Sequence, residues 1–87
     1  MKKLLSATYV GDFQILLIYQ GEKPRIFDFR PMLKKQLGDF VNLKDEEVFK
    51  QFKILEGWNT LEWQNGYDIA PETLYETSIP ASLTKVI

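Results

Sequence analysis

The stretch FQILLIYQ, residues 13–20, decides the fold of this chain. It is rich in β-branched and aromatic residues and carries no helix cap, which is typical of a β-strand. Side chains alternate between the two faces of a strand, so the apolar residues fall into two sets: Phe13, Ile15, Leu17 and Tyr19 on one face, and Leu16 and Ile18 on the other. Because both faces are apolar, we expect a central strand that is covered on both sides.

Two further strands are predicted beside this stretch. Residues 4–10 suit a strand, and Gly11-Asp12 fits a two-residue hairpin turn in which glycine supplies the positive φ. On the other side, residues 21–24 turn the chain into a third strand over residues 25–29. The three strands predict an antiparallel meander.

The periodicity then becomes helical. In FRPMLKKQLG, residues 29–38, Pro31 fits the first helical position and Gly38 can end the helix. In NLKDEEVFKQF, residues 42–52, Asp45 fits the N-cap and two glutamates follow in the first turn. Both patterns predict short helices that pack on the sheet.

The last third of the chain predicts a second hairpin and a third helix. Ile54-Leu55, a turn at Gly57 and a strand over residues 58–63 form the hairpin, and Pro71-Glu72 starts the helix. The expected fold class is therefore α+β, with a small antiparallel sheet (a meander plus a second hairpin) and two or three short helices packed on it. We expect one domain over residues 1–77 and a C-terminal tail over residues 78–87, for which a frayed end, an added strand and an oligomer contact stay open.

Composition excludes most side-chain chemistry. The 87 residues include no Cys and no His, so the usual zinc and copper ligands, a thiol nucleophile and an imidazole base are missing. Hydrophobic residues make up 45% of the chain, which is enough for a core without disulfides or metal. The apolar run after Lys2-Lys3 is too short for a signal peptide or a membrane span. We expect a cytoplasmic protein that is not an enzyme and has no cofactor, metal site or membrane segment.

Charge is uneven along the chain. The net charge is −1, but residues 54–84 carry no Lys or Arg and five acids: Glu56, Glu62, Asp68, Glu72 and Glu76. Two interpretations stay open: an acidic face that meets a basic partner, and an ordinary solvated surface. A pI near 5.4 argues against general nucleic-acid binding, although Lys34 and Lys35 could touch phosphates from the first helix. Glu56, Glu62, Asp68 and Glu72 could also form an acid/base pair, but so short a chain offers few walls for a catalytic cleft.

The segment WQNGYDIAPETLY, residues 63–75, has two interpretations of its own. In the first it forms a ligand or partner pocket, with Trp63 and Tyr75 as aromatic walls and Asn65, Asp68 and Glu72 as polar contacts. In the second it is an architectural corner, made of a core tryptophan, an Asn-Gly turn, an aspartate cap and a packed helix. The sequence favours the corner.

Several motifs in this order resemble one family. They are FDFRPML over residues 27–33, F-x-x-L-x-D over 40–45, Gly57, W-x-N-G-x-D over 63–68 and P-E-x-L-Y over 71–75. Over residues 10–75 the chain resembles the bacterial family called domain of unknown function 2442, in which it would be a short stand-alone member. The resemblance implies an α+β domain with a small antiparallel sheet and no established enzymatic activity. It also implies members that stand alone or join a helix-turn-helix, often encoded beside a second small protein as in a toxin and antitoxin pair.

From these observations we expect a non-enzymatic protein-interaction module. It would be the antitoxin-like or regulatory partner of a small adjacent-encoded protein, and it would bind through a sheet edge, the acidic C-terminal half or the apolar tail. The alternative is a transcription-linked or ligand-sensing domain that works beside a DNA-binding module. We expect no direct nucleic-acid binding, and self-association stays open.

Overall fold

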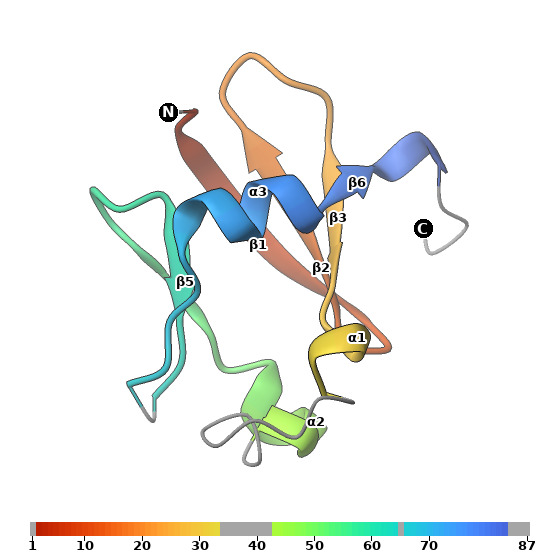
Figure 1. Cartoon of the computed structure of the whole chain (residues 1–87), viewed down its shortest axis with the longest axis vertical. Helices are drawn as coiled ribbons and strands as arrows, with labels where there is room; N and C mark the ends of the chain where they lie inside the picture. The colour runs from red at the N-terminus through yellow and green to blue at the C-terminus, as the bar shows by residue number, and fades with distance from the viewer. Residues whose placement is uncertain (1, 34–42, 65, 84–87) are drawn as a thin grey trace.

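The computed structural model describes residues 2–33, 43–64 and 66–83. The main sheet has four antiparallel strands in the order β1-β2-β3-β6 (Figure 1). These strands are β1 (Leu4–Gly11), β2 (Gln14–Tyr19), β3 (Arg25–Asp28) and β6 (Ile79–Pro80). A separate two-stranded sheet pairs β4 (Lys53–Leu55) with β5 (Thr60–Glu62). The α+β class, the meander and the second hairpin are therefore confirmed.

The turn between β1 and β2 lies one residue later than predicted. Gly11 pairs with Gln14, so the turn residues are Asp12 and Phe13, with φ angles of 53° and 59°. A register shift between Tyr9 and Gly11 makes this possible, because it inserts an extra residue into β1. Phe13 is held in this unusual conformation by packing, since its ring lies 5.1 Å from that of Phe49. The contact between Phe13 and Phe49 thus outweighs the local preference for placing Gly11 in the turn.

Only one face of β2 is fully covered. Ile15, Leu17 and Tyr19 are buried, as the alternation predicts. Leu16 and Ile18 on the opposite face are half-buried, so the expected second cover is incomplete.

The helices are short and occupy the predicted places. They are α1 (Arg30–Leu33), α2 (Glu46–Phe49) and α3 (Pro71–Thr77), followed by the 3-10 turn η2 (Ala81–Leu83). Asp45 is the N-cap of α2, because its carboxylate accepts from the backbone N–H of Glu47 at 2.9 Å. The N-cap of α3 is Ala70, so the predicted capping role of Asp68 is wrong. Asp68 instead pairs through its backbone with Glu62 in an isolated β-bridge. Gly38, the predicted end of the first helix, lies outside the described residues.

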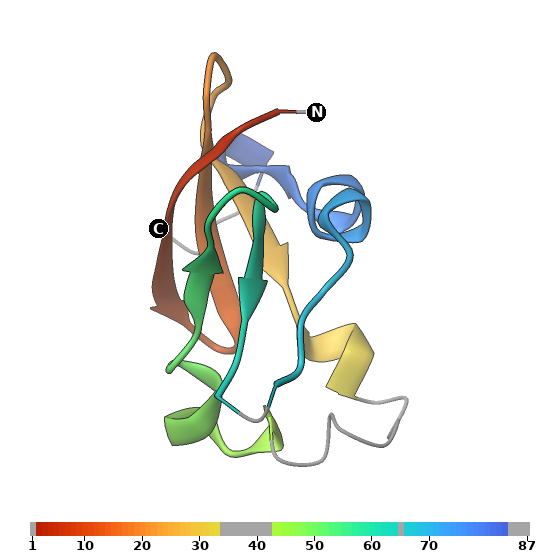
Figure 2. The same ribbon diagram turned by 90° about the vertical axis from the view of Figure 1, so that its left-hand side faces the viewer.

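The core lies between the main sheet, the second hairpin and α3. Its centre is a cluster of rings in which Phe49 lies 5.1 Å from Phe29 and 5.6 Å from Trp63. Figure 2 shows α3 on one side of the main sheet with the second hairpin beside it. Leu74 is the buried residue of α3, and Leu61 is the buried apolar residue of β5. The corner interpretation of residues 63–75 therefore holds for Trp63 and for the helix start at Pro71.

The segment after α3 adds a strand. Ser78 is buried, and Ile79 and Pro80 pair with Ile26 and Arg25 of β3. Of the three possibilities left open for this segment, an added strand is what the structure has at Ile79–Pro80. No helix within the described ranges is both long enough and apolar enough to cross a membrane.

Candidate functional site

The structure separates the five residues that the sequence singled out. Trp63 is 1% exposed and belongs to the core, although it also contributes to an open hollow beside Lys53 and Glu62. Asp68 lies in a different hollow, together with Trp58. Only two of the five, Glu72 and Tyr75, line the same pocket, and Asn65 lies outside the described residues.

The turn between β4 and β5 presents an aromatic side chain that the sequence placed in a strand. Trp58 is 66% exposed and precedes β5, which begins at Thr60 and not at residue 58. Its neighbours Gly57 and Asn59 have φ angles of 82° and 56°, which turn the chain tightly. The sequence signal was present: Trp58 stands between two residues that favour left-handed backbone, which is typical of a turn.

This turn is held by hydrogen bonds. The backbone N–H of Trp58 donates to the carbonyl oxygen of Leu55 at 3.1 Å. The side-chain oxygen of Asn59 accepts from the backbone N–H of Leu4 at 3.1 Å, which ties the turn to β1. The indole of Trp58 is therefore displayed from a fixed backbone.

Hollows flank the turn on two sides. One, of about 330 Å³, runs from Leu55 and Trp58 to Asp68 and Pro71. The other, of about 250 Å³, includes Leu5, which is 51% exposed. We call the first hollow the Trp58 face, which is lined by Leu55, Trp58, Thr60, Asp68, Ile69, Ala70 and Pro71.

Several carboxylates on and near this face have no ion pair with another residue that the structure describes. The four ion pairs of the described residues involve other acids: Glu22, Asp28, Glu47 and Glu62. Seven exposed acids of the described residues form no ion pair with another described residue, and four of these seven lie in the last third of the chain: Glu56, Asp68, Glu72 and Glu76. Lys3 contributes to the neighbouring hollow together with Glu56. The surface is therefore acidic overall, with one lysine at its edge.

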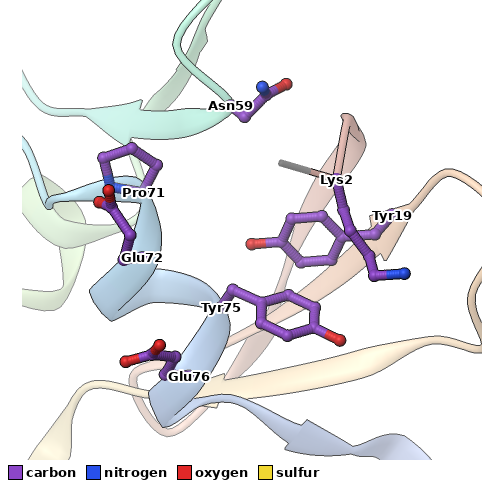
Figure 3. Close-up of a pocket in the computed structure, with 7 residues that line it drawn as sticks. All are labelled: Lys2, Tyr19, Asn59, Pro71, Glu72, Tyr75 and Glu76. Atoms are coloured by element: carbon purple, nitrogen blue, oxygen red, sulfur yellow. The ribbon is translucent and has the colours of Figure 1, made fainter.

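The pocket beside α3 is the second feature of this end of the molecule. It has a volume of about 190 Å³ and is lined by residues from four segments: Lys2, Tyr19, Asn59, Pro71, Glu72, Tyr75 and Glu76. Figure 3 shows the hydroxyl of Tyr19 pointing toward α3 in the middle of these residues. Tyr19 is 2% exposed, and burial raises the pKa of its hydroxyl to about 12, an effect that Arg25 partly offsets.

One wall of the pocket is fixed by a polar network. Glu22 accepts hydrogen bonds from the hydroxyl of Tyr75 and from the ammonium group of Lys2, each at 2.8 Å. These contacts lower the pKa of the Glu22 carboxyl and raise those of Lys2 and Tyr75. The guanidinium of Arg25 lies 4.5 Å from the centre of the Tyr75 ring, so this ring is held by a cation as well.

Over residues 2–33, 43–64 and 66–83, no three acidic side chains gather closely enough to hold a metal ion. Tyr19, Lys2 and Asn59 were not predicted as site residues, because they come from segments that only the fold brings beside α3. Tyr19 was expected on the same face of its strand as Ile15 and Leu17, and all three are buried.

Comparison with known proteins gives one match. The model of the family described as "Protein of unknown function (DUF2442)" matches residues 4–80. No curated protein and no solved structure shows significant similarity to the chain.

Proposed function

Since the chain belongs to this family of proteins of unknown function, we propose that it is a protein-interaction module and not an enzyme. The partner is a small basic protein, and the chain acts in the cytoplasm as the antitoxin-like or regulatory half of the pair. It does so by covering a basic surface of the partner with the Trp58 face.

The exposed indole of Trp58 is the observation that carries this proposal. Tryptophan is among the residues that contribute most to binding energy in protein interfaces. The ring is 66% exposed on a turn that is held by a hydrogen bond, so little backbone entropy is lost when it docks. The hollow beside it, between Leu55 and Pro71, gives a partner side chain a place to pack.

The charge of the rim supports a basic partner. Asp68 lines the face and Glu56 lines the neighbouring hollow, both without an ion pair among the described residues, and Glu72 follows directly after Pro71. Complementary charges on two proteins speed their association and fix their relative orientation. Both effects weaken as the salt concentration rises.

The test is capture of the partner by the tagged full-length chain from its own cells. The matched pair of variants is Trp58→Ala and Ile79→Ala, because Ile79 is also exposed, at 46%, but lies at β6 on the edge of the main sheet. We expect one small basic protein, in stoichiometric amount, with the wild type and with Ile79→Ala, and its loss with Trp58→Ala. Equal recovery by all three chains overturns the proposal.

A further inference from the structure

The Trp58 face places an exposed aromatic ring and an exposed carboxylate in one hollow. Trp58 and Asp68 are both exposed, and both line the hollow of about 330 Å³. Trp58 is carried by the hydrogen-bonded turn, and the backbone of Asp68 is held by its β-bridge to Glu62. A group of a partner can therefore reach both side chains, and both extend from a fixed backbone.

The charge around this hollow is negative when acids and bases are both counted. Asp68 is the charged residue among the described residues that line it. The adjoining segments add three acids and two lysines: Glu56, Glu62, Glu72, Lys3 and Lys53. Lys53 is paired with Glu62 at 3.8 Å, and the guanidinium of Arg25 is engaged by the Tyr75 ring in another part of the molecule. Four acids therefore stand against two lysines in this region, and Asp68 forms no ion pair within the described ranges.

The walls of the hollow suit a long side chain with a flat cationic end. Indole is the aromatic ring that attracts cations most strongly. Leu55, Ala70 and Pro71 supply apolar surface along which the stem of such a side chain can lie. The volume of about 330 Å³ equals that of about eleven water molecules at liquid density, so a long side chain fits without displacing the walls.

We propose that the Trp58 face binds the guanidinium group of an arginine side chain of the protein partner. The plane of the guanidinium stacks on the indole of Trp58, and its edge donates a pair of hydrogen bonds to the carboxylate of Asp68. A lysine cannot make both contacts, because its ammonium group is compact, strongly hydrated and without a plane that stacks. An anionic group is disfavoured, because it would meet the carboxylate of Asp68.

This inference rests on the proposed function for the source of the arginine. The guanidinium site itself depends on the two side chains and the hollow between them. The site and its source can therefore be tested separately.

The first experiment titrates the full-length ¹⁵N-labelled chain with Nα-acetyl-arginine methylamide at constant chloride concentration and follows the indole N–H signal of Trp58. Nα-acetyl-citrulline methylamide is the control with the same planar shape and no charge. Nα-acetyl-lysine methylamide is the control with the same charge and no plane. We expect saturable shifts with a Kd on the order of 10 mM for the arginine compound. Binding should be at least about threefold weaker for the lysine compound and undetectable for the citrulline compound.

Variants of the chain test the two contacts. Asp68→Asn removes the charge and keeps the backbone pairing, and it should weaken binding of the arginine compound by about threefold or more. Glu76→Gln is the matched control, because Glu76 is also an exposed acid without an ion pair among the described residues but does not line the hollow. Trp58→Ala should abolish the shifts of the amide signals of residues 68–70. The amide spectrum of each variant also shows whether it is folded.

Three results overturn the guanidinium site. They are equal shifts with all three ligands, no saturable shift with the arginine compound, and binding by Asp68→Asn that is as tight as that of the wild type. Weakening by Glu76→Gln to the same extent as by Asp68→Asn also contradicts the site, because it would show an effect of net charge alone.

The second experiment repeats the partner capture with Asp68→Asn and Glu76→Gln. Marked weakening by Asp68→Asn alone supports the arginine source. Full retention of the partner by both variants, together with its loss by Trp58→Ala, overturns the arginine source and leaves the proposed function standing. If the arginine compound binds but no protein is captured, the proposed function and the partner source both fail, while the guanidinium site stands.

Discussion

The indole N–H of Trp63 donates a hydrogen bond of 2.6 Å to the carbonyl oxygen of Phe49. This bond joins the end of the second hairpin to the last residue of α2 in the middle of the ring cluster. It explains why the tryptophan of the WQNGYD segment is part of the architecture: its polar atom is satisfied inside the core and has no capacity left for a ligand.

Trp63→Phe should therefore destabilise the protein by about 2–4 kcal/mol. The substitution leaves the carbonyl of Phe49 without its buried donor and opens a cavity in the ring cluster. The measurement is the free energy of unfolding from urea denaturation. Trp58→Phe is the matched control and should change it by less than about 0.5 kcal/mol, because that ring is exposed. A loss below about 1 kcal/mol for Trp63→Phe contradicts this role.

Tyr19→Phe should leave stability unchanged or raise it by up to about 1 kcal/mol. The ring and its packing stay, and a buried hydroxyl without a partner among the described residues is removed. Thermal and urea unfolding of both proteins at pH 7 measure the effect. A clear destabilisation would mean that the hydroxyl already has a partner in the free protein.

Asp45→Ala should cost about 1 kcal/mol of stability, because it removes the side-chain acceptor at the start of α2. Asp68→Ala is the control and should cost less than about 0.5 kcal/mol, since Asp68 does not cap α3 and its backbone pairing survives the change. Equal losses for the two variants are incompatible with the capping geometry.

Stability should fall in acid partly through Glu22. Its pKa is lowered in the folded protein by hydrogen bonds from Lys2 and Tyr75, so its contribution is complete above its ordinary pKa of 4.5. That contribution is lost as the pH falls through the lower folded value. Unfolding free energies of wild type and Glu22→Gln should differ by a constant amount between pH 7 and pH 5, and the difference should shrink below pH 4.5. A difference that persists unchanged at pH 3 contradicts the assignment.

Local pattern was sufficient for most of the fold. Alternation in residues 13–20 placed Phe13, Ile15, Leu17 and Tyr19 on one face, and all of these but the half-buried Phe13 are buried; capping chemistry predicted the start of α2. The position of the turn at Asp12-Phe13 was not predicted, because its φ angles depend on the packing of Phe13 against Phe49, which lies far along the chain. For the segment of β6 the sequence left an added strand as one of three possibilities and could not choose it, since so short a strand has no periodicity and is defined by its pairing with β3.

Less of the candidate site could be predicted from the sequence. Glu72 and Tyr75 were singled out and do line one pocket, but its other walls come from distant segments. Lys2, Tyr19 and Asn59 meet α3 only once the meander and the second hairpin have packed. A linear pattern could reveal Trp58 as an exposed turn residue, but not the hollow beside it.

The most direct test of the central claim is the dissociation constant of the purified chain and its captured partner, compared between wild type, Trp58→Ala and Ile79→Ala. We predict that Trp58→Ala weakens binding by about 30-fold or more, the effect of an interface residue worth at least about 2 kcal/mol. Ile79→Ala should stay within about twofold of wild type. If Trp58→Ala binds as tightly as wild type, the Trp58 face is not the binding surface.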